Sequence, residues 1–438
     1  MRRLFGLLCL MVVACTADVE NGNRNNGVTE PSNTMATVAG VDCDDNVCVL
    51  SGVITENLTM TADNVYLLRG GVFIGDDLSQ NTLIIEPGTT IYGESNSDGM
   101  LIVRRNAKIL AEGTVDEPIV FTSSKNLGSR TRGDWGGLIL NGNAPINSCG
   151  DQEFCEAQGE GGTGLYGGND PDGDSGVLKY VRIEFAGTLV SPDNELNGLA
   201  LQGVGANTTL DFIQIHMNAD DGVEFFGGNA NIKHLVVSGV GDDALDWTDG
   251  WQGNAQYVVL QQHLDAGDNG IEADNNGENN IVTPMSNPTL ANMTIIGSGG
   301  ASSDIGALLR EGTGAFIANS LIYGWGDASL DVDGDATWAN ADLGDLAMVG
   351  TLVDSDTNFK IDDGEPQLVE DWFYAEDSNE EGGFALIDPQ NQASPNFLPT
   401  EIINGAVFVD DSFFDDVSFI GAMGDEDWTL GWTAYPEA

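Results

Sequence analysis

Carboxylates recur at matching places in three consecutive short segments of this chain. Glu224, Asp246 and Glu272 each lie between two apolar residues. Successive side chains of a β-strand point to opposite faces, so the apolar neighbours would enter a core and the carboxylates would share the outer face. If these segments are strands stacked on one another, the three carboxylates lie about 4.8 Å apart.

Carboxylates at that spacing either take up protons, with raised pKa values, or recruit a cation. More acidic or amide side chains precede them, and no Lys or Arg occurs between Lys233 and Arg310. Oxygen-only ligands at this density favour calcium. Asp and Asn also commonly satisfy backbone groups in turns, and the sequence leaves both roles open.

Two further loops carry alternating carboxylates beside a glycine, a pattern that can wrap a hard cation, although neither completes an EF-hand. The sequence favours calcium loops at both places. The full set of predicted calcium ligands is Asp170, Asp172, Asp174, Asp221, Glu224, Asp243, Asp246, Asp268, Glu272, Asp331, Asp333 and Asp335.

The elements that must position these side chains are short, repeated strands. One apolar template begins at residues 178, 210, 232, 255, 290 and 317, and a second set of strands, which contains the carboxylates, recurs in step with it. The shortest interval is 22 residues, and longer intervals contain Gly/Asn-rich insertions. A fixed strand template with loops of variable length is typical of a coiled solenoid. The sequence therefore predicts an all-β fold, a parallel solenoid over residues 41–340.

Several phrases resemble the right-handed parallel β-helices of the pectin-lyase-like superfamily. They begin at Leu83-Ile-Ile-Glu-Pro-Gly-Thr and at Pro118-Ile-Val-Phe-Thr. Residues 132–146 and 419–432 are similar to largely uncharacterised bacterial surface lipoproteins, including spirochaete outer-membrane ones. The resemblance covers most of residues 45–435. It implies a right-handed parallel β-helix and surface anchoring, and it specifies no reaction.

The segment Gly241-Asp-Asp-Ala is similar to the Gly-Asp-Asp element of polygalacturonases, which implies inverting hydrolysis with Asp242, Asp243 and Asp246 as the alternative catalytic residues. That family also has a His-Gly pair and an Arg-x-Lys substrate clamp, which this sequence lacks. We therefore favour a protein without catalytic activity.

The N-terminus has the features of a secretory signal: two arginines followed by a short apolar run. This run ends at Val12-Val-Ala-Cys15, which resembles the lipobox of bacterial lipoproteins and implies lipidation of Cys15 after removal of residues 1–14. Residues 15–40 are polar and predict a flexible tether. The resemblance implies export and anchoring to the outer membrane, with the cell surface as the expected location.

Four cysteines remain, as the close pairs Cys43/Cys48 and Cys149/Cys155. In an oxidising compartment they predict two local disulfides, and metal binding is the weaker alternative because no histidine lies near either pair.

The chain carries 69 acidic and 15 basic residues, a formal net charge of −54. Such a surface repels nucleic acid, and it repels anionic glycan unless divalent cations mediate. Residues 341–438 are acidic and rich in aromatic residues. They predict a C-terminal cap over the open end of the solenoid, with a separate sugar-binding module as the alternative.

Together these features predict a lipid-anchored surface protein with a non-catalytic, calcium-assisted binding or adhesion role. Its expected partners are the membrane and a glycan, matrix component or outer-membrane protein. Two alternatives remain: a polysaccharide-degrading β-helix enzyme and an accessory component of an outer-membrane uptake system.

Overall fold

The computed structural model describes residues 38–150, 152, 154–191 and 195–437. The predicted signal peptide, Cys15 and nearly all of the predicted tether lie outside the described residues. Residues 38–438 form one compact unit.

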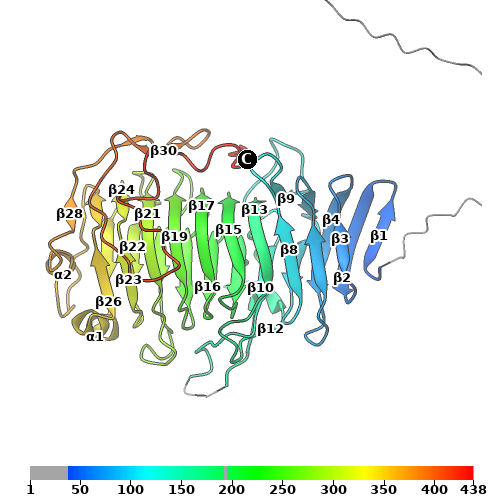
Figure 1. The fold of residues 1–438 in the computed structure, drawn as a ribbon, viewed down its shortest axis with the longest axis horizontal. Coiled ribbons are helices and arrows are strands. Elements are labelled where there is room, and N and C mark those ends of the chain that lie inside the picture. The colour runs from blue at the N-terminus through cyan, green and yellow to red at the C-terminus, as the bar shows by residue number, and fades with distance from the viewer. Residues whose placement is uncertain (1–37, 151, 153, 192–194, 438) are drawn as a thin grey trace, which may run out of the picture. The chain divides into compact units, whose positions relative to one another are not determined.

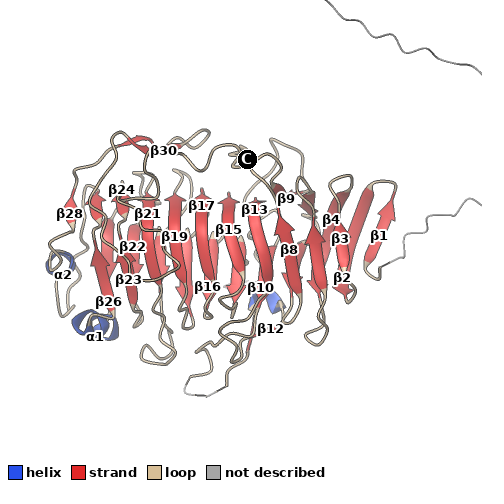
Figure 2. Cartoon of the chain, in the orientation of Figure 1, coloured by secondary structure: helices blue, strands red, loops and turns tan. Residues whose placement is uncertain are grey.

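The described chain is a right-handed parallel β-helix, as predicted (Figure 1). Strands dominate the described residues, and their helices lie near the C-terminal end of the solenoid and in one loop (Figure 2). The main sheet has 26 strands. Its described pairings are parallel except for that of β1 (Val41–Asp44) with β2 (Val47–Ile54). Following the pairings from coil to coil separates three ladders, which we call A, B and C.

Ladder A contains the second halves of β2 and of β4 (Val65–Ile74), then β7 (Met100–Val103), β10 (Gly137–Asn141), β14 (Leu199–Gln202), β16 (Val223–Phe226), β18 (Leu245–Thr248), β20 (Ile271–Ala273), β22 (Ile305–Leu309) and β25 (Ala328–Val332). Ladder B contains β3 (Leu58–Met60), β5 (Thr82–Ile85), β8 (Lys108–Glu112), the first halves of β13 (Gly176–Glu184), β15 (Thr209–His216), β17 (Asn231–Ser238), β19 (Asn254–Gln261) and β21 (Thr289–Ile296), then β23 (Ala315–Ala318) and β26 (Leu346–Val349). Ladder C contains the first halves of β2 and β4, then β6 (Thr90–Gly93), β9 (Ile119–Ser123), the second halves of β13, β15, β17, β19 and β21, then β24 (Leu321–Tyr323), β27 (Leu352–Asp354) and β28 (Glu380–Glu381).

The first strand template of the sequence predicts one strand per coil. In the structure this strand bends in the middle, so that its first half pairs in ladder B and its second half pairs in ladder C. A residue in left-handed backbone conformation lies at the bend in each coil, with φ between 50° and 61°. These residues are Tyr180, Phe212, His234, Tyr257 and Asn292. A non-glycine residue rarely adopts positive φ, so sequence periodicity alone gave no sign of the bend.

The core fills the inside of the coils. Phe225, Trp247 and Ile271 are fully buried, and each neighbours one of the carboxylates of ladder A in sequence. The alternation predicted for these three strands is therefore present: apolar side chains point inward and carboxylates point outward.

Each end of the described helix has its own closure. At the start, β1 folds back on β2 and the disulfide Cys43–Cys48 joins the two strands, as predicted. At the other end, β26, β27 and β28 continue ladders B and C beyond residue 340, where the predicted cap region begins. Helices α1 (Asp335–Leu343) and α2 (Val369–Phe373) lie against this last part of the solenoid.

After β28 the chain turns back along the outside of ladder C, through β29 (Leu386–Asp388) and β30 (Asn396–Pro399), to end beside β13 (Figure 1). Trp432 is fully buried there in a cluster with outward-facing Val236 and Val259. Gln214 exchanges two hydrogen bonds with the backbone of Ala434, both 2.9 Å. The aromatic tail thus covers ladder C. None of the helices in the described part of the chain is long and apolar enough to cross a membrane.

Candidate functional site

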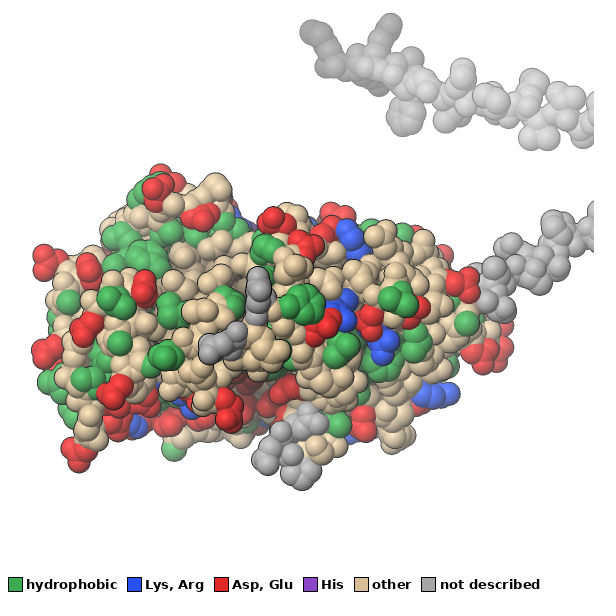
Figure 3. Space-filling model, turned by 90° about the horizontal axis from the view of Figure 1, so that it is seen from below, with side chains coloured by type: hydrophobic (Ala, Val, Ile, Leu, Met, Phe, Trp, Pro, Cys, Tyr) green, Lys and Arg blue, Asp and Glu red, His purple; other side chains and the backbone are tan. Residues whose placement is uncertain are grey.

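Parallel pairing brings the three carboxylates of ladder A into one row. Glu224 lies opposite Asp246, and Asp246 lies opposite Glu272, on consecutive coils. We call these three residues the acidic row. Figure 3 views the molecule from the lower side of Figure 1, a face with many acidic side chains and few basic ones. The register that the sequence predicted for the row is the register in the structure.

Further carboxylates gather at the turn before each strand. In three overlapping groups, one oxygen of each member lies within 4.8 Å of the others. These groups are Asp221/Glu224/Asp246, Asp220/Asp221/Asp242 and Asp242/Asp243/Asp268. The structure therefore brings together five predicted ligands and adds Asp220 and Asp242, which directly precede two of them in sequence.

The turn carboxylates also satisfy the backbone. Asp221 Oδ1 accepts the N–H of Asp243 at 3.0 Å, and Asp243 Oδ1 accepts the N–H of Asn269 at 2.6 Å. Asn269 Oδ1 accepts the N–H of Ile305 at 3.2 Å in the next coil. Since an amide oxygen performs this role at Asn269, the turn does not require a charged group. Each Asp uses one oxygen for the turn, and its second oxygen is available to the cluster.

Three carboxylates of these groups are buried. Asp221, Glu224 and Asp243 are 7%, 8% and 4% exposed. Burial, followed by the charge of neighbouring carboxylates, raises their pKa values well above the usual range. Glu224 has one strong partner, the side-chain amide of Asn197, which donates to Oε2 at 2.5 Å.

Asp246, at the middle of the acidic row, is the least satisfied member. Its Oδ1 is inaccessible to solvent and has no hydrogen-bond partner among the described residues. Burial and the charges of Glu272 and Asp243 raise its pKa well above the usual range. A buried carboxylate oxygen without a donor is costly, and a proton or a cation would remove that cost.

One basic side chain closes the end of the row. The guanidinium of Arg310 contacts Glu272 and donates from Nε to Asp274 Oδ1 at 3.0 Å. Burial nevertheless outweighs Arg310 and raises the pKa of Glu272 to about 7. Beyond Glu272 the row continues through Leu308 to Asp331, so an apolar residue interrupts the carboxylates.

An insertion of residues 142–170 lies over the earlier coils of ladder A. Tyr166 and Ile146 pack there on outward-facing Ile102, Ile139 and Ala200. The insertion includes β11 (Ala157–Gln158), the 3-10 helix η1 (Glu160–Gly162) and β12 (Leu165–Tyr166).

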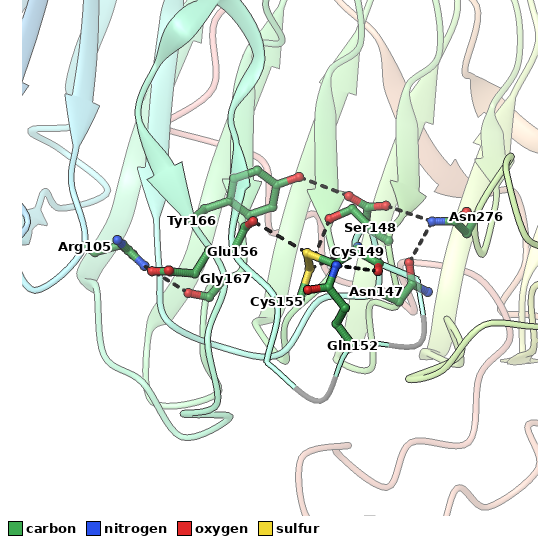
Figure 4. The surroundings of a disulfide bond; sticks show 11 residues. Arg105, Asn147, Ser148, Cys149, Gln152, Cys155, Glu156, Tyr166, Gly167 and Asn276 are labelled. Atoms are coloured by element: carbon green, nitrogen blue, oxygen red, sulfur yellow. Dashed lines mark hydrogen bonds and ion pairs between the residues drawn. A yellow bond between two sulfur atoms is a disulfide. The ribbon is translucent and has the colours of Figure 1, made fainter.

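Polar contacts hold the insertion in place (Figure 4). The predicted disulfide Cys149–Cys155 closes its tip. Tyr166 Oη donates to Asp249 at 3.0 Å, and the side-chain amide of Asn147 donates to Asn275 Oδ1 at 2.8 Å. The insertion is thereby fixed to coils that carry the acidic row.

The insertion also contributes a carboxylate that sequence reasoning missed. Burial, followed by the charges of Asp220 and Glu195, raises the pKa of Glu160 to about 7. Burial and Asp242 raise the pKa of Asp220 to the same value. Glu160 is about sixty residues from Asp220 along the chain, and no motif marks it, so only the fold reveals its position.

The two predicted calcium loops differ. Asp170, Asp172 and Asp174 are not among the converging groups found in the described residues; Asp174 instead pairs with Lys108 and accepts the N–H of Gly176 at 2.8 Å. These side chains line an open polar pocket of about 460 Å³. Asp331 and Asp333 do converge, but with Asp362, whereas Asp335 is the first residue of α1.

The alternative catalytic residues lie in the same region. Oxygens of Asp242 and Asp243 lie within 4.8 Å of each other, which is closer than the roughly 6.5–9.5 Å of an inverting pair. Asp243 accepts a hydrogen bond from the backbone of Asn269, and one oxygen of Asp246 is inaccessible to solvent. This arrangement suits ion binding better than acid–base catalysis across a glycosidic bond.

Comparison with known proteins agrees with the fold. A search of curated proteins returns no match. Among solved structures, the crystal structure of the Dettilon tailspike protein (gp208) is similar, with 12% sequence identity and a TM-score of 0.24. That similarity covers 70% of this chain and 54% of the tailspike chain, so the chain spans about half of the tailspike's length. The family model of a pectate-lyase-like β-helix domain matches residues 52–391. Because that model includes most of the ladder strands, the chain belongs to the family of pectate-lyase-like β-helix domains.

Proposed function

We propose that this protein is a lipid-anchored surface protein that binds glycan through divalent cations, with calcium as the favoured ion, held on ladder A. The anchor is lipidated Cys15, and the outer membrane is the expected location. The role is binding or adhesion without catalysis.

The observation that carries the proposal is the inaccessible Oδ1 of Asp246, which has no hydrogen-bond partner among the described residues and lies in the row between Glu224 and Glu272. Without a cation, burial and mutual repulsion raise the pKa values of the acidic row and its turn carboxylates, so these groups keep protons to higher pH than exposed carboxylates do. Calcium accepts six to eight oxygen ligands in flexible geometry, so it suits clustered carboxylates on neighbouring coils. A cation that keeps open coordination positions can also take hydroxyl or carboxylate oxygens from a glycan.

The charge of the chain supports a mediating ion. A formal net charge of −54 repels acidic polysaccharide, and calcium on ladder A would reverse the local field. The one basic group described beside the acidic row, Arg310, is engaged with Glu272 and Asp274. A substrate clamp like that of the polygalacturonases is absent from the sequence, which supports binding over hydrolysis.

A glycan panel tests the proposal. Purified residues 38–438, which form their own compact unit, are assayed with millimolar calcium and again with EDTA. We expect binding of at least one glycan in calcium, loss of that binding in EDTA, and loss in the double variant Glu224→Gln/Asp246→Asn. The control variant Asp170→Asn/Asp172→Asn makes the same change of charge outside the converging groups and should bind normally.

The outcomes separate the alternatives. New reducing ends or unsaturated products would contradict a binding role and favour the enzyme. Glycan binding that persists in EDTA would contradict the proposal that a divalent cation mediates it. The uptake-accessory alternative predicts no glycan binding and co-purification with an outer-membrane protein.

A further inference from the structure

A second group of carboxylates lies at the last coil of ladder A. Asp331 ends the outward row on β25, Asp333 follows it, and Asp362 comes from the next coil. One oxygen of each lies within 4.8 Å of the others. We call these three residues the terminal cluster.

Asp331 is the buried member of the terminal cluster, with 6% of its surface exposed. Its carboxylate forms no ion pair with any residue that the structure describes, and its one hydrogen bond there comes from the adjacent backbone of Val332, which leaves most of its acceptor sites unused. The nearby ammonium group of Lys360 pairs with Asp327 instead. Burial, followed by the charges of Asp333 and Asp362, raises the pKa of Asp331 to about 7. Asp331 is thus more than nine-tenths buried within a small group of acids, and the basic side chains that act on this group, Lys360 and Arg310, form their ion pairs with other carboxylates.

The terminal cluster is separate from the acidic row. Glu272 and Asp331 are two coils apart, with Leu308 between them in register. Two strand spacings amount to about 9.6 Å, too far for one cation to bind both carboxylates. Arg310 also stands at the end of the acidic row. Ions at the two places would therefore be bound by different residues.

The backbone around the terminal cluster joins the two halves of the C-terminal closure. Leu330 donates its N–H to Asn358 O at 3.0 Å and accepts the N–H of Lys360 at 2.9 Å. The N–H of Gly334, directly before α1, contacts the carboxylate of Glu365 at 3.2 Å. Asp331 and Asp333 thus lead into α1, and Asp362 belongs to the segment that leads into α2.

We propose that Asp331, Asp333 and Asp362 form a binding site for one hard divalent cation that fastens α1 and α2 to the last coil. Three carboxylates match the oxygen ligands that calcium and magnesium take, and ligands from two separate segments suit calcium, which accepts a less regular geometry than magnesium. The site is structural. It acts on the closure of the solenoid and does not depend on glycan binding at the acidic row.

Hydrogen exchange of the intact protein, freed of metal with EDTA and then given calcium, tests the proposal. If opening of the closure requires loss of the ion, calcium at one hundred times its Kd slows exchange in α1 and α2 by about 100-fold. We expect this slowing in the wild type and in Glu224→Gln/Asp246→Asn. We expect it to be lost in Asp331→Asn/Asp362→Asn.

Matched controls make each outcome decisive. Asp42→Asn/Asp44→Asn removes the same charge at the opposite end of the solenoid and should keep the slowing. Should the terminal double variant fail to fold, the single variant Asp333→Asn replaces it and should require a higher calcium concentration for the same slowing. Absence of calcium-dependent slowing in the wild type, unchanged slowing in the terminal variants, or equal slowing by KCl at matched ionic strength would each overturn the proposal. Loss of glycan binding in Glu224→Gln/Asp246→Asn with the slowing intact would separate the two sites.

Discussion

The outward row of ladder A has two parts built on one backbone pattern. In the earlier coils it reads Phe73, Ile102, Ile139 and Ala200, each opposite the next. From the following coil it reads Glu224, Asp246 and Glu272.

The first part is covered by the protein's own insertion, and the second part gathers carboxylates without enough positive charge. Inward residues are apolar in both parts. The comparison teaches that the inward positions keep one apolar character along the solenoid, whereas the outward positions change with what covers them. The outward position of each coil is free to be chosen either for packing or for binding.

The largest effect on stability is expected when a carboxylate is introduced into the apolar first part of the row. Ile139→Asp places a carboxylate in a fully buried position among the apolar side chains beneath the insertion. An unpaired buried charge of this kind should lower the free energy of unfolding by about 3 kcal/mol or more. Urea denaturation measures the loss, and limited proteolysis should show new cleavage within residues 142–170. Equal stability of Ile139→Asp and wild type would show that the insertion does not depend on the apolar row.

The next largest effect is the stabilisation of the protein by calcium bound at the second part of the row. A cation that binds only the native state at one hundred times its Kd adds about 2.7 kcal/mol to the free energy of unfolding. Calorimetric melting across a calcium titration should show the rise in wild type and a smaller rise in Glu224→Gln/Asp246→Asn. A melting temperature that does not change up to millimolar calcium would remove the cation from both proposals.

A smaller effect is expected when the second part loses one charge in the absence of metal. Asp246→Asn keeps the shape of the side chain and removes a carboxylate that is raised in pKa by burial and by Glu272. In EDTA at pH 8 the variant should be more stable than wild type by about 1 kcal/mol, because the repulsion disappears. The exposed Asp170→Asn change should have no measurable effect. A destabilised Asp246→Asn protein would indicate that its carboxylate already has a partner.

Local alternation and repetition were enough to predict the coils and the acidic row, and the close spacing of the cysteines predicted both disulfides. Glu224, Asp246 and Glu272 each sit between apolar residues, and this pattern determines the face on which they lie. The bend at Tyr180 or Phe212 could not be predicted, because bulky residues seldom take positive φ and do so here within the tertiary structure.

The parts of the site that depend on long-range contacts also escaped prediction. Glu160 reaches the acids through a folded insertion, and Asp362 replaces Asp335 in the terminal cluster because helix α1 begins at Asp335. Sequence spacing describes ligands within one loop, whereas a solenoid supplies ligands from neighbouring coils. Cys15 and its lipid remain a prediction from the lipobox resemblance alone.

The smallest effect concerns Glu160, which links the two parts because it belongs to the insertion and faces the acids. Its pKa is raised to about 7 by burial and by Asp220, so in EDTA the native protein binds a proton there that the unfolded chain has already lost at pH 6 to 7. Stability is therefore highest below the unfolded pKa and falls as the pH rises through 7, by about 0.7 kcal/mol per pH unit for one such group.

Urea denaturation between pH 5.5 and 8 should show a shallower slope in Glu160→Gln than in wild type, and the exposed Glu112→Gln change should leave the slope unaltered. Calcium should flatten the wild-type slope, because a bound cation takes over the role of the protons. A stability that instead increases from pH 6 to 8 without metal would mean that these carboxylates are already compensated, and the distinction between the two parts of the row would then rest on packing alone.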